Sequence, residues 1–253
     1  MTPERMDGFT IAVASGMRAR MESLDMLANN LANQGSPGYK ADREFYSLYV
    51  SPEALESVDA SVLPTPPTAP VIESRWTDFS QGTLAETGGA LHVGLSGPGF
   101  FRILGPNGPL LTRNGNFRLS TAGQLQTQEG YPVLGRDGKP IVLDGKQSIK
   151  INTTGEVRQG GTEIAQLDIV TVKQPQALAK RSGTYFQMDD GGGAAPANAL
   201  VYQGRLETAN HSPADAAVRL ITVLRQFEML QKAVQISGEM NRKVEELARV
   251  SGG

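Results

Sequence analysis

The sequence predicts an α+β protein in which long N- and C-terminal helices, coiled-coil-like in their apolar spacing, flank a central, mainly antiparallel β domain. At both ends of the chain, apolar residues recur at helical intervals. In the middle, short β-like runs alternate with glycine-containing turn signals. This order predicts four regions: residues 1–45, an N-terminal assembly helix with an asparagine motif; 46–75, a proline-rich connector; 76–205, the β domain; and 206–253, a C-terminal assembly helix.

The first helix is expected over residues 7–33. Its apolar side chains are separated by four, four, seven, three and four positions, which places them on one helix face: Phe9, Val13, Met17, Leu24, Leu27 and Leu31. Gly35, Pro37 and Gly38 follow immediately and end the helix.

The last helix is expected over residues 213–250. Ser212 is a suitable N-cap and Pro213 suits the first helical position. Its apolar stripe follows spacings of three and four and then continues, after a one-residue drift, through Ile236 and Met240: Leu220, Val223, Phe227, Leu230 and Val234. At 1.5 Å per residue such a helix is longer than about 50 Å. A domain of this size cannot cover the whole stripe, so the terminal helices must pair with each other or with neighbouring subunits.

Between the helices, prolines dominate residues 51–71 and predict an extended path over residues 63–70. From residue 76 onwards, strands are expected around residues 91–93, 100–103, 149–151, 167–172 and 184–188, and a glycine-rich loop over 189–197. Asn-Gly and Asp-Gly dipeptides at 107–108, 114–115, 137–138 and 144–145 are typical of the turns between them. Strands this short and closely spaced favour a sandwich or barrel-like domain.

The residues that could carry chemistry are few. The chain has no cysteine, and its two histidines, His92 and His211, lie in different regions without a partner at ligand spacing. The glycine-rich stretch 94–99 lacks a following Lys-Ser/Thr and continues as a strand, so it is not a phosphate loop. We therefore predict no catalytic residue, no metal site and no cofactor. A carboxylate pair drawn from Glu86, Glu129, Glu156 and Glu163 stays open as an alternative, since strands can bring acids together.

Charge and hydropathy limit the partners. The net charge is −2 and no Lys/Arg block stands out, which argues against nucleic acid as a partner. No apolar run approaches about 18 residues, so no direct membrane insertion is expected. The first 20 residues lack the pattern of a cleaved signal peptide.

Three asparagines, Asn29, Asn30 and Asn33, stand near the end of the first predicted helix. Asparagine is a poor helix former, so the cluster has two interpretations. It either ends the helix, or its amides fix the register between subunits, as buried asparagine does in coiled coils.

Several motifs resemble those of flagellar rod and hook proteins. Residues 28–33 (Ala-Asn-Asn-Leu-Ala-Asn) with 38–40 (Gly-Tyr-Lys) are similar to the N-terminal signature of that family. The resemblance continues, in family order, through residues 95–101, 112–117, 123–125, 130–135, 183–186, 206–210 and 225–228. It departs at residues 34–37, and at Ala209 and His211, where the family commonly has Ser and Val.

This resemblance implies a structural subunit of the bacterial flagellar basal-body rod, not an enzyme. It implies export through the flagellar type III apparatus without a cleaved signal, a place in the rod that spans the periplasm, and torque transmission for motility. The implied partners are other proximal and distal rod proteins and copies of itself. The stretch between Phe45 and Trp76 is short, whereas the distal rod protein usually carries a longer insertion there, so the chain most resembles the F-type proximal rod protein. A distal rod or hook subunit, or a wall hydrolase built on the β domain, are the alternatives.

The expected subunit interface combines both helices and the asparagine motif. Its residues are Val13, Leu24, Leu27, Asn29, Asn30, Leu31, Asn33, Leu220, Val223, Phe227, Leu230, Val234 and Met240.

Overall fold

The structure is a computed structural model of the 253-residue chain, and it describes residues 3–50, 68–188 and 194–251. The chain forms two compact units. Unit 1 combines Met1–Leu31, Asp42–Trp76 and Pro213–Gly253, and unit 2 combines Ala32–Ala41 with Thr77–Ser212. The chain therefore passes between the units at residues 31–32, 41–42, 76–77 and 212–213.

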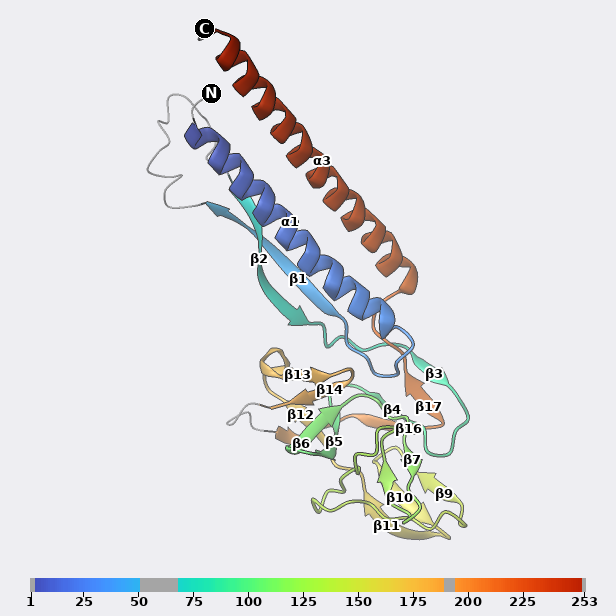
Figure 1. Cartoon of the computed structure of the whole chain (residues 1–253). Coiled ribbons are helices and arrows are strands. Elements are labelled where there is room, and N and C mark those ends of the chain that lie inside the picture. The colour runs from blue at the N-terminus through green and yellow to red at the C-terminus, as the bar shows by residue number, and fades with distance from the viewer. Residues whose placement is uncertain (1–2, 51–67, 189–193, 252–253) are drawn as a thin grey trace. The chain divides into compact units, whose positions relative to one another are not determined.

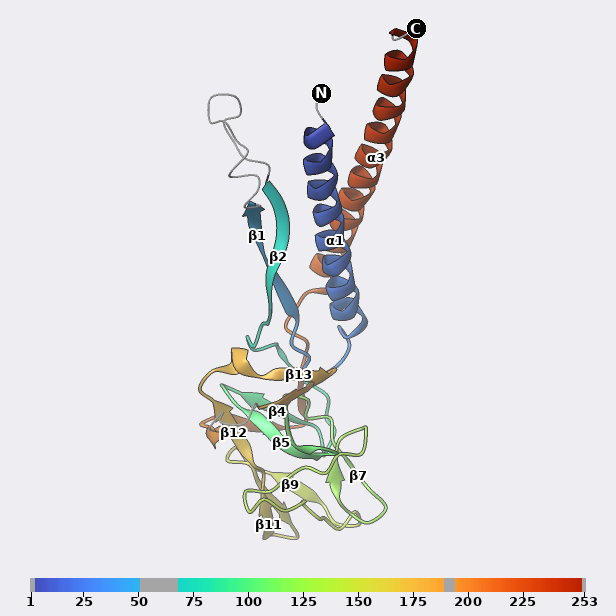
Figure 2. The same cartoon turned by 60° about the vertical axis from the view of Figure 1, so that its left-hand side comes forward.

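Unit 1 is built on the two terminal helices. Helix α1 runs from Pro3 to Ala32 and helix α3 from Pro213 to Ser251, and they lie side by side in both ribbon views (Figures 1 and 2). Met26 and Leu27 of α1 are buried against Val223 of α3, and Leu24 and Leu220 pack around them. The predicted arrangement of two long terminal helices around antiparallel β structure is confirmed, although α1 begins four residues earlier than expected.

Unit 1 also contains two strands that the sequence analysis did not predict. Strand β1 (Asp42–Val50) and strand β2 (Thr68–Thr77) form a two-stranded sheet and run in opposite directions (Figure 1). Pro70 is compatible with β2 because each strand of a two-stranded sheet has an outer edge that needs no amide donor. Residues 51–67, which hold most of the prolines of the predicted connector, lie outside the described part of the chain.

Unit 2 contains the remaining strands, and every strand pairing described in it is antiparallel. The largest sheet has the order β13-β14-β6-β5-β12-β15. Its strands are Ala179–Ser182, Tyr185–Gln187, Gly108–Thr112, Phe100–Gly105, Ile169–Val172 and Ala194–Pro196. A short 3-10 helix, Pro175–Ala177, links β12 to β13.

The smaller sheets complete unit 2. A three-stranded sheet has the order β11 (Thr162–Gln166), β10 (Glu156–Gln159) and β9 (Ile149–Ile151). Three strand pairs join β16 (Leu200–Gln203) to β4 (Val93–Ser96), β17 (Arg205–Glu207) to β3 (Leu84–Glu86), and β7 (Arg118–Leu119) to β8 (Leu125–Gln126).

The predicted strands at 100–103, 149–151, 167–172 and 184–188 correspond to β5, β9, β12 and β14, whereas β4 begins only at Val93, the last residue of the strand expected at 91–93. The predicted loop at 189–197 was wrong for its last part, because Ala194–Pro196 pairs with β12; residues 189–193 lie outside the description.

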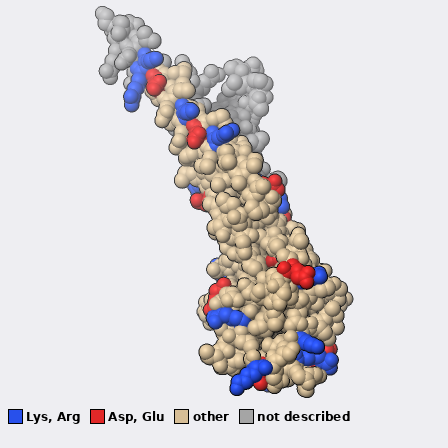
Figure 3. Space-filling model, turned by 90° about the vertical axis from the view of Figure 1, so that its right-hand side faces the viewer, with Lys and Arg blue, Asp and Glu red and all other residues tan. Residues whose placement is uncertain are grey.

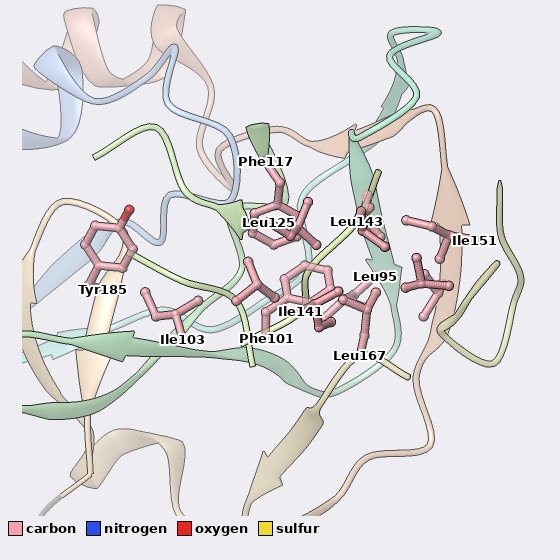
Figure 4. Close-up of a cluster of buried hydrophobic side chains, with 14 residues drawn as sticks. Leu95, Phe101, Ile103, Phe117, Leu125, Ile141, Leu143, Ile151, Leu167 and Tyr185 are labelled. Atoms are coloured by element: carbon pink, nitrogen blue, oxygen red, sulfur yellow. The ribbon is translucent and has the colours of Figure 1, made fainter. Parts of the chain in front are cut away.

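Strand β5 separates two hydrophobic clusters in unit 2. Successive side chains of a strand point to opposite faces, so Phe101 and Ile103 enter one cluster while Phe100 enters the other. Figure 4 shows the larger cluster, in which the rings of Phe101 and Phe117 meet edge to face with centroids 5.1 Å apart. This packing gives unit 2 a core of its own.

Phe101→Ala is expected to lower the free energy of unfolding by about 3–5 kcal/mol, because it removes a fully buried ring and leaves a cavity. Leu104→Ala, on the same strand but 42% exposed, should cost less than about 1 kcal/mol. Urea denaturation followed by circular dichroism compares the two variants. Equal midpoints would show that β5 is not the centre of the core.

Candidate assembly interface

The motif at residues 38–41 lies inside unit 2, against the segment that leads towards α3. The Lys40 ammonium is 2.6 Å from Oε1 of Glu207, and Nε of Arg113 is 2.9 Å from Oε2 of the same carboxylate. The side chains of Lys40 and Glu207 are fully buried, and that of Arg113 is 4% exposed. We name residues 38–41, Arg113 and residues 207–210 the clasp.

The clasp buries two cations with one carboxylate, which leaves a surplus positive charge. Main-chain carbonyls compensate it: Lys40 donates to the Ser80 carbonyl at 2.6 Å, and Arg113 donates to the carbonyls of Gly99 at 2.6 Å and Gly97 at 2.9 Å. Burial lowers the pKa of the Lys40 ammonium, and the charge of Glu207 opposes that shift. Glu207 is therefore the counter-charge on which both cations depend.

Close backbone approach explains the glycine and asparagine in the clasp. Gly38 has φ +68°, and a Cβ there would lie 2.4 Å from the carbonyl carbon of Arg113, so only glycine fits. The Asn210 side chain donates to the Asp78 carbonyl at 2.6 Å and accepts from the Ala41 amide at 2.9 Å. The Gly-Tyr-Lys motif and Asn210, which both carried the family resemblance, thus meet in space.

In unit 1, Asn30 has a role within the chain. Its side chain donates to the Asp42 carbonyl at 2.9 Å and accepts from the Asp42 amide at 3.0 Å, so it pairs with β1 as a neighbouring strand would. Asn30 is 5% exposed, whereas Asn29 is exposed and the carbonyl of Asn33 accepts a turn hydrogen bond from Ser36. The amide of Asn30 therefore fixes the end of α1 against the start of β1.

Glu44 of β1 connects its strand to both helices of unit 1. Its carboxylate, 1% exposed, accepts a hydrogen bond from Ser23 of α1 at 2.8 Å and pairs with Arg219 of α3 at 2.9 Å. Sequence reasoning missed this residue, because nothing in the local pattern of β1 indicates that a charged side chain points between two helices.

The predicted interface residues do not share one environment. Leu24, Leu27, Leu220 and Val223 belong to the core between α1 and α3. Val13 is buried, Leu31, Phe227 and Leu230 are half-buried, and Val234 and Met240 are 45% and 57% exposed. That these residues contact other subunits stays a prediction. Among the apolar ones, Val234 and Met240 are the most exposed.

Helix α3 carries a second apolar stripe that its own chain leaves exposed. Val218, Met229, Ile236 and Met240 are 57–66% exposed and are separated by eleven, seven and four positions, which places them along one line of the helix. In Figure 3, residues other than Lys, Arg, Asp and Glu, drawn in tan, cover most of the face of the helical unit that the view shows. An exposed apolar stripe is typical of a surface that binds another protein, so this stripe is a candidate for the predicted subunit interface.

Catalytic geometry is not evident in the described ranges. The cavity of about 320 Å³ in unit 2 is lined by a single acid, Asp168, which pairs with Arg102 at 2.9 Å. Glu129 binds the Tyr185 hydroxyl, and Glu156 accepts from Asn152 at 2.8 Å, so each of these carboxylates has a polar partner within the β unit. Among the residues described, no group of three potential metal ligands exists. Within the same residues, no helix has the length and apolarity to cross a membrane.

The known proteins that this chain resembles in sequence belong to one family. Residues 94–159 match the model of the flagellar hook protein FlgE/F/G D1 domain, and residues 202–247 match that of the flagellar basal body rod FlgEFG protein C-terminal region. The chain is 28% identical over 244 residues to the flagellar basal-body rod protein FlgF of Caulobacter vibrioides, covering 95% of this chain and 98% of that protein.

Two FlgG proteins are similar to the same extent. The flagellar basal-body rod protein FlgG of Agrobacterium fabrum is 31% identical over 249 residues, covering 90% of this chain and 94% of that protein. FlgG of Buchnera aphidicola (subsp. Schizaphis graminum) is 28% identical over 260 residues, covering 92% and 96%.

Asn30→Ala is expected to lower the free energy of unfolding of unit 1 by about 1–3 kcal/mol, because it leaves two main-chain groups of Asp42 without their partner. Asp25→Ala, an exposed change on the same helix, should stay within about 0.5 kcal/mol. Thermal unfolding monitored by helical circular dichroism at 222 nm tests the difference. A loss no larger for Asn30→Ala than for Asp25→Ala would contradict the role of this amide within the chain.

Proposed function

The chain belongs to the family of flagellar basal-body rod proteins, and we propose that it is an F-type subunit of the proximal rod that assembles through its terminal helices. It is a structural protein of the flagellum, not an enzyme. In this proposal it leaves the cytoplasm through the flagellar type III apparatus and joins other rod proteins and copies of itself in the periplasm.

The short stretch between Phe45 and Trp76 supports the F-type assignment, because the distal rod protein of the family that the chain resembles usually carries a longer insertion there. Percentage identity does not separate the FlgF from the FlgG relatives. The axial position of the subunit is therefore a question for the labelling experiment below.

The exposed stripe on α3 is the observation that carries the assembly proposal. Full burial of such a side chain contributes about 1.5–3 kcal/mol, so covering the 57–66% that is still exposed contributes roughly 1–2 kcal/mol for each of the four, and together they supply a substantial contact for a neighbouring helix. A contact that extends along a long helix distributes torque over many side chains, which is what a rod requires.

The edge strands of unit 2 are poorly suited to bind a neighbouring subunit. Edge strand β13 carries Lys180 and Arg181 and a register shift, and edge strand β15 ends at Pro196. In the smaller sheet, Ile164 of β11 lies opposite a register shift, and the Gln203 side chain hydrogen-bonds the main chain of β9 at Ile149 and Ile151. Edges of this kind discourage strand addition and support assembly through the helices.

Ile236→Asp is expected to leave the purified protein folded and to abolish swimming when it replaces the wild-type copy, because it places a charge in the exposed stripe. A loss of about 1.4 kcal/mol at one contact already lowers an association constant tenfold. The matched control is Gln235→Asp, an exposed change one position away. Complete hook–basal bodies are counted by electron microscopy, and normal numbers with Ile236→Asp would argue against the stripe as an interface.

Immunogold labelling of purified hook–basal bodies tests the axial position. We expect label on the proximal rod. Label on the distal rod or the hook would retain the family and refute the F-type assignment. Intact basal bodies without any label would contradict the assignment of this chain as a rod subunit.

A further inference from the structure

A ten-residue segment of the chain is separated from its neighbours in the fold. Ala32–Ala41 belongs to unit 2, although the residues immediately before and after it belong to unit 1. The segment contributes Tyr39 and Lys40 to the interior of unit 2, and both are fully buried. It therefore docks into unit 2 as an individual piece of chain.

Lys180 donates to the Lys40 carbonyl at 2.9 Å, and several further binding partners of this segment lie near the other end of the chain. The Gly38 amide donates to the Glu207 carbonyl at 2.7 Å, and the Ala41 amide donates to the Asn210 side chain at 2.9 Å. The carbonyl of Ala41 accepts from the Asp78 amide, and Asn210 also binds the Asp78 carbonyl. Residues 207–210 thus hold the segment directly and through residue 78.

The buried charges make the docking of residues 32–41 depend on Glu207. If Lys40 entered unit 2 without Glu207, a second buried cation would join Arg113 without its ion-pair partner, and only the weaker influence of Asp78 would oppose the two positive charges, which is strongly unfavourable. Conversely, Glu207 accepts hydrogen bonds from both Lys40 and the Gly82 amide through the same oxygen, so it also organises the segment that precedes β3.

We infer that the clasp is a two-ended lock: the segment that follows α1 docks into the β unit only when the segment that leads into α3 is in place. The lock lies entirely within unit 2 and does not depend on the axial position of the subunit. Its effect is that both ends of the chain become fixed to the β unit together, so a subunit with only one end docked is disfavoured.

Hydrogen–deuterium exchange of the purified full-length protein tests the lock. In Glu207→Gln, we expect exchange at residues 36–41 to accelerate at least about tenfold, as loss of a charge-assisted contact allows, while amides of β5 and β6 stay protected as in the wild type. Glu163→Gln, an exposed change on β11, serves as the matched control and should alter neither region.

Asn210→Ala provides an independent test, because it removes the amide that holds Ala41 and leaves the three charged side chains in place. It should also release residues 36–41 selectively, and it decides the question if Glu207→Gln fails to fold. Unchanged protection at residues 36–41 would overturn the inference. Equal acceleration in residues 36–41 and in β5 and β6 would overturn it too, because the segment would then unfold only with the whole β unit.

Discussion

The carboxylate of Glu207, buried between Lys40 and Arg113, is the interaction on which the arrangement of the chain depends. Buried ion pairs contribute little net stability, and apolar replacements of similar volume are often as stable. What such a group supplies is selectivity, because each wrong pairing leaves a charge without a partner in the interior. Here that selectivity acts on register: Lys40 fits only where Glu207 and the Ser80 carbonyl converge, and Gly38 fits only against the main chain of Arg113.

Unit 1 uses the same principle with less apolar packing. The described core between α1 and α3 is small and centres on Met26, Leu27 and Val223. Polar contacts supplement it, since Glu44 joins both helices and Asn30 pairs with the main chain of Asp42. In the described part of the chain, α3 therefore keeps exposed apolar side chains beyond its contact with α1, and the proposed assembly through the helices would use them.

Local patterns predicted the helices well, because the period of 3.6 residues and the Ser-Pro start at residues 212–213 can be read within one segment. Strand β5 was predicted for the same reason, since Phe100 and Phe101 follow a glycine turn. Strand β2 was missed because the prolines around residue 67 dominate the local signal, and strand β1 was missed because the pairing that stabilises it joins residues far apart in the sequence. The clasp could not be predicted from spacing, because Lys40 and Glu207 are 167 positions apart. Only the resemblance of residues 38–40 and 206–210 to family motifs indicated that both segments are important.

The apolar residues on the two faces of α3 repeat with different periods. This difference limits how neighbouring helices can coil around each face. Leu220 and Val223 pack on α1, and the same face continues at three-four spacing through Phe227 and Leu230, a seven-residue repeat that favours a left-handed supercoil. On the exposed face, Val218, Met229 and Met240 are separated by eleven residues each, a repeat of about 3.67 residues per turn that drifts slightly in the opposite sense. One helix cannot coil in both directions, so its two faces cannot both form long supercoiled seams. In the proposed assembly, a short inner contact with α1 and a longer, nearly straight outer contact with a neighbouring subunit would satisfy both patterns, and the short inner contact agrees with the small core described between α1 and α3.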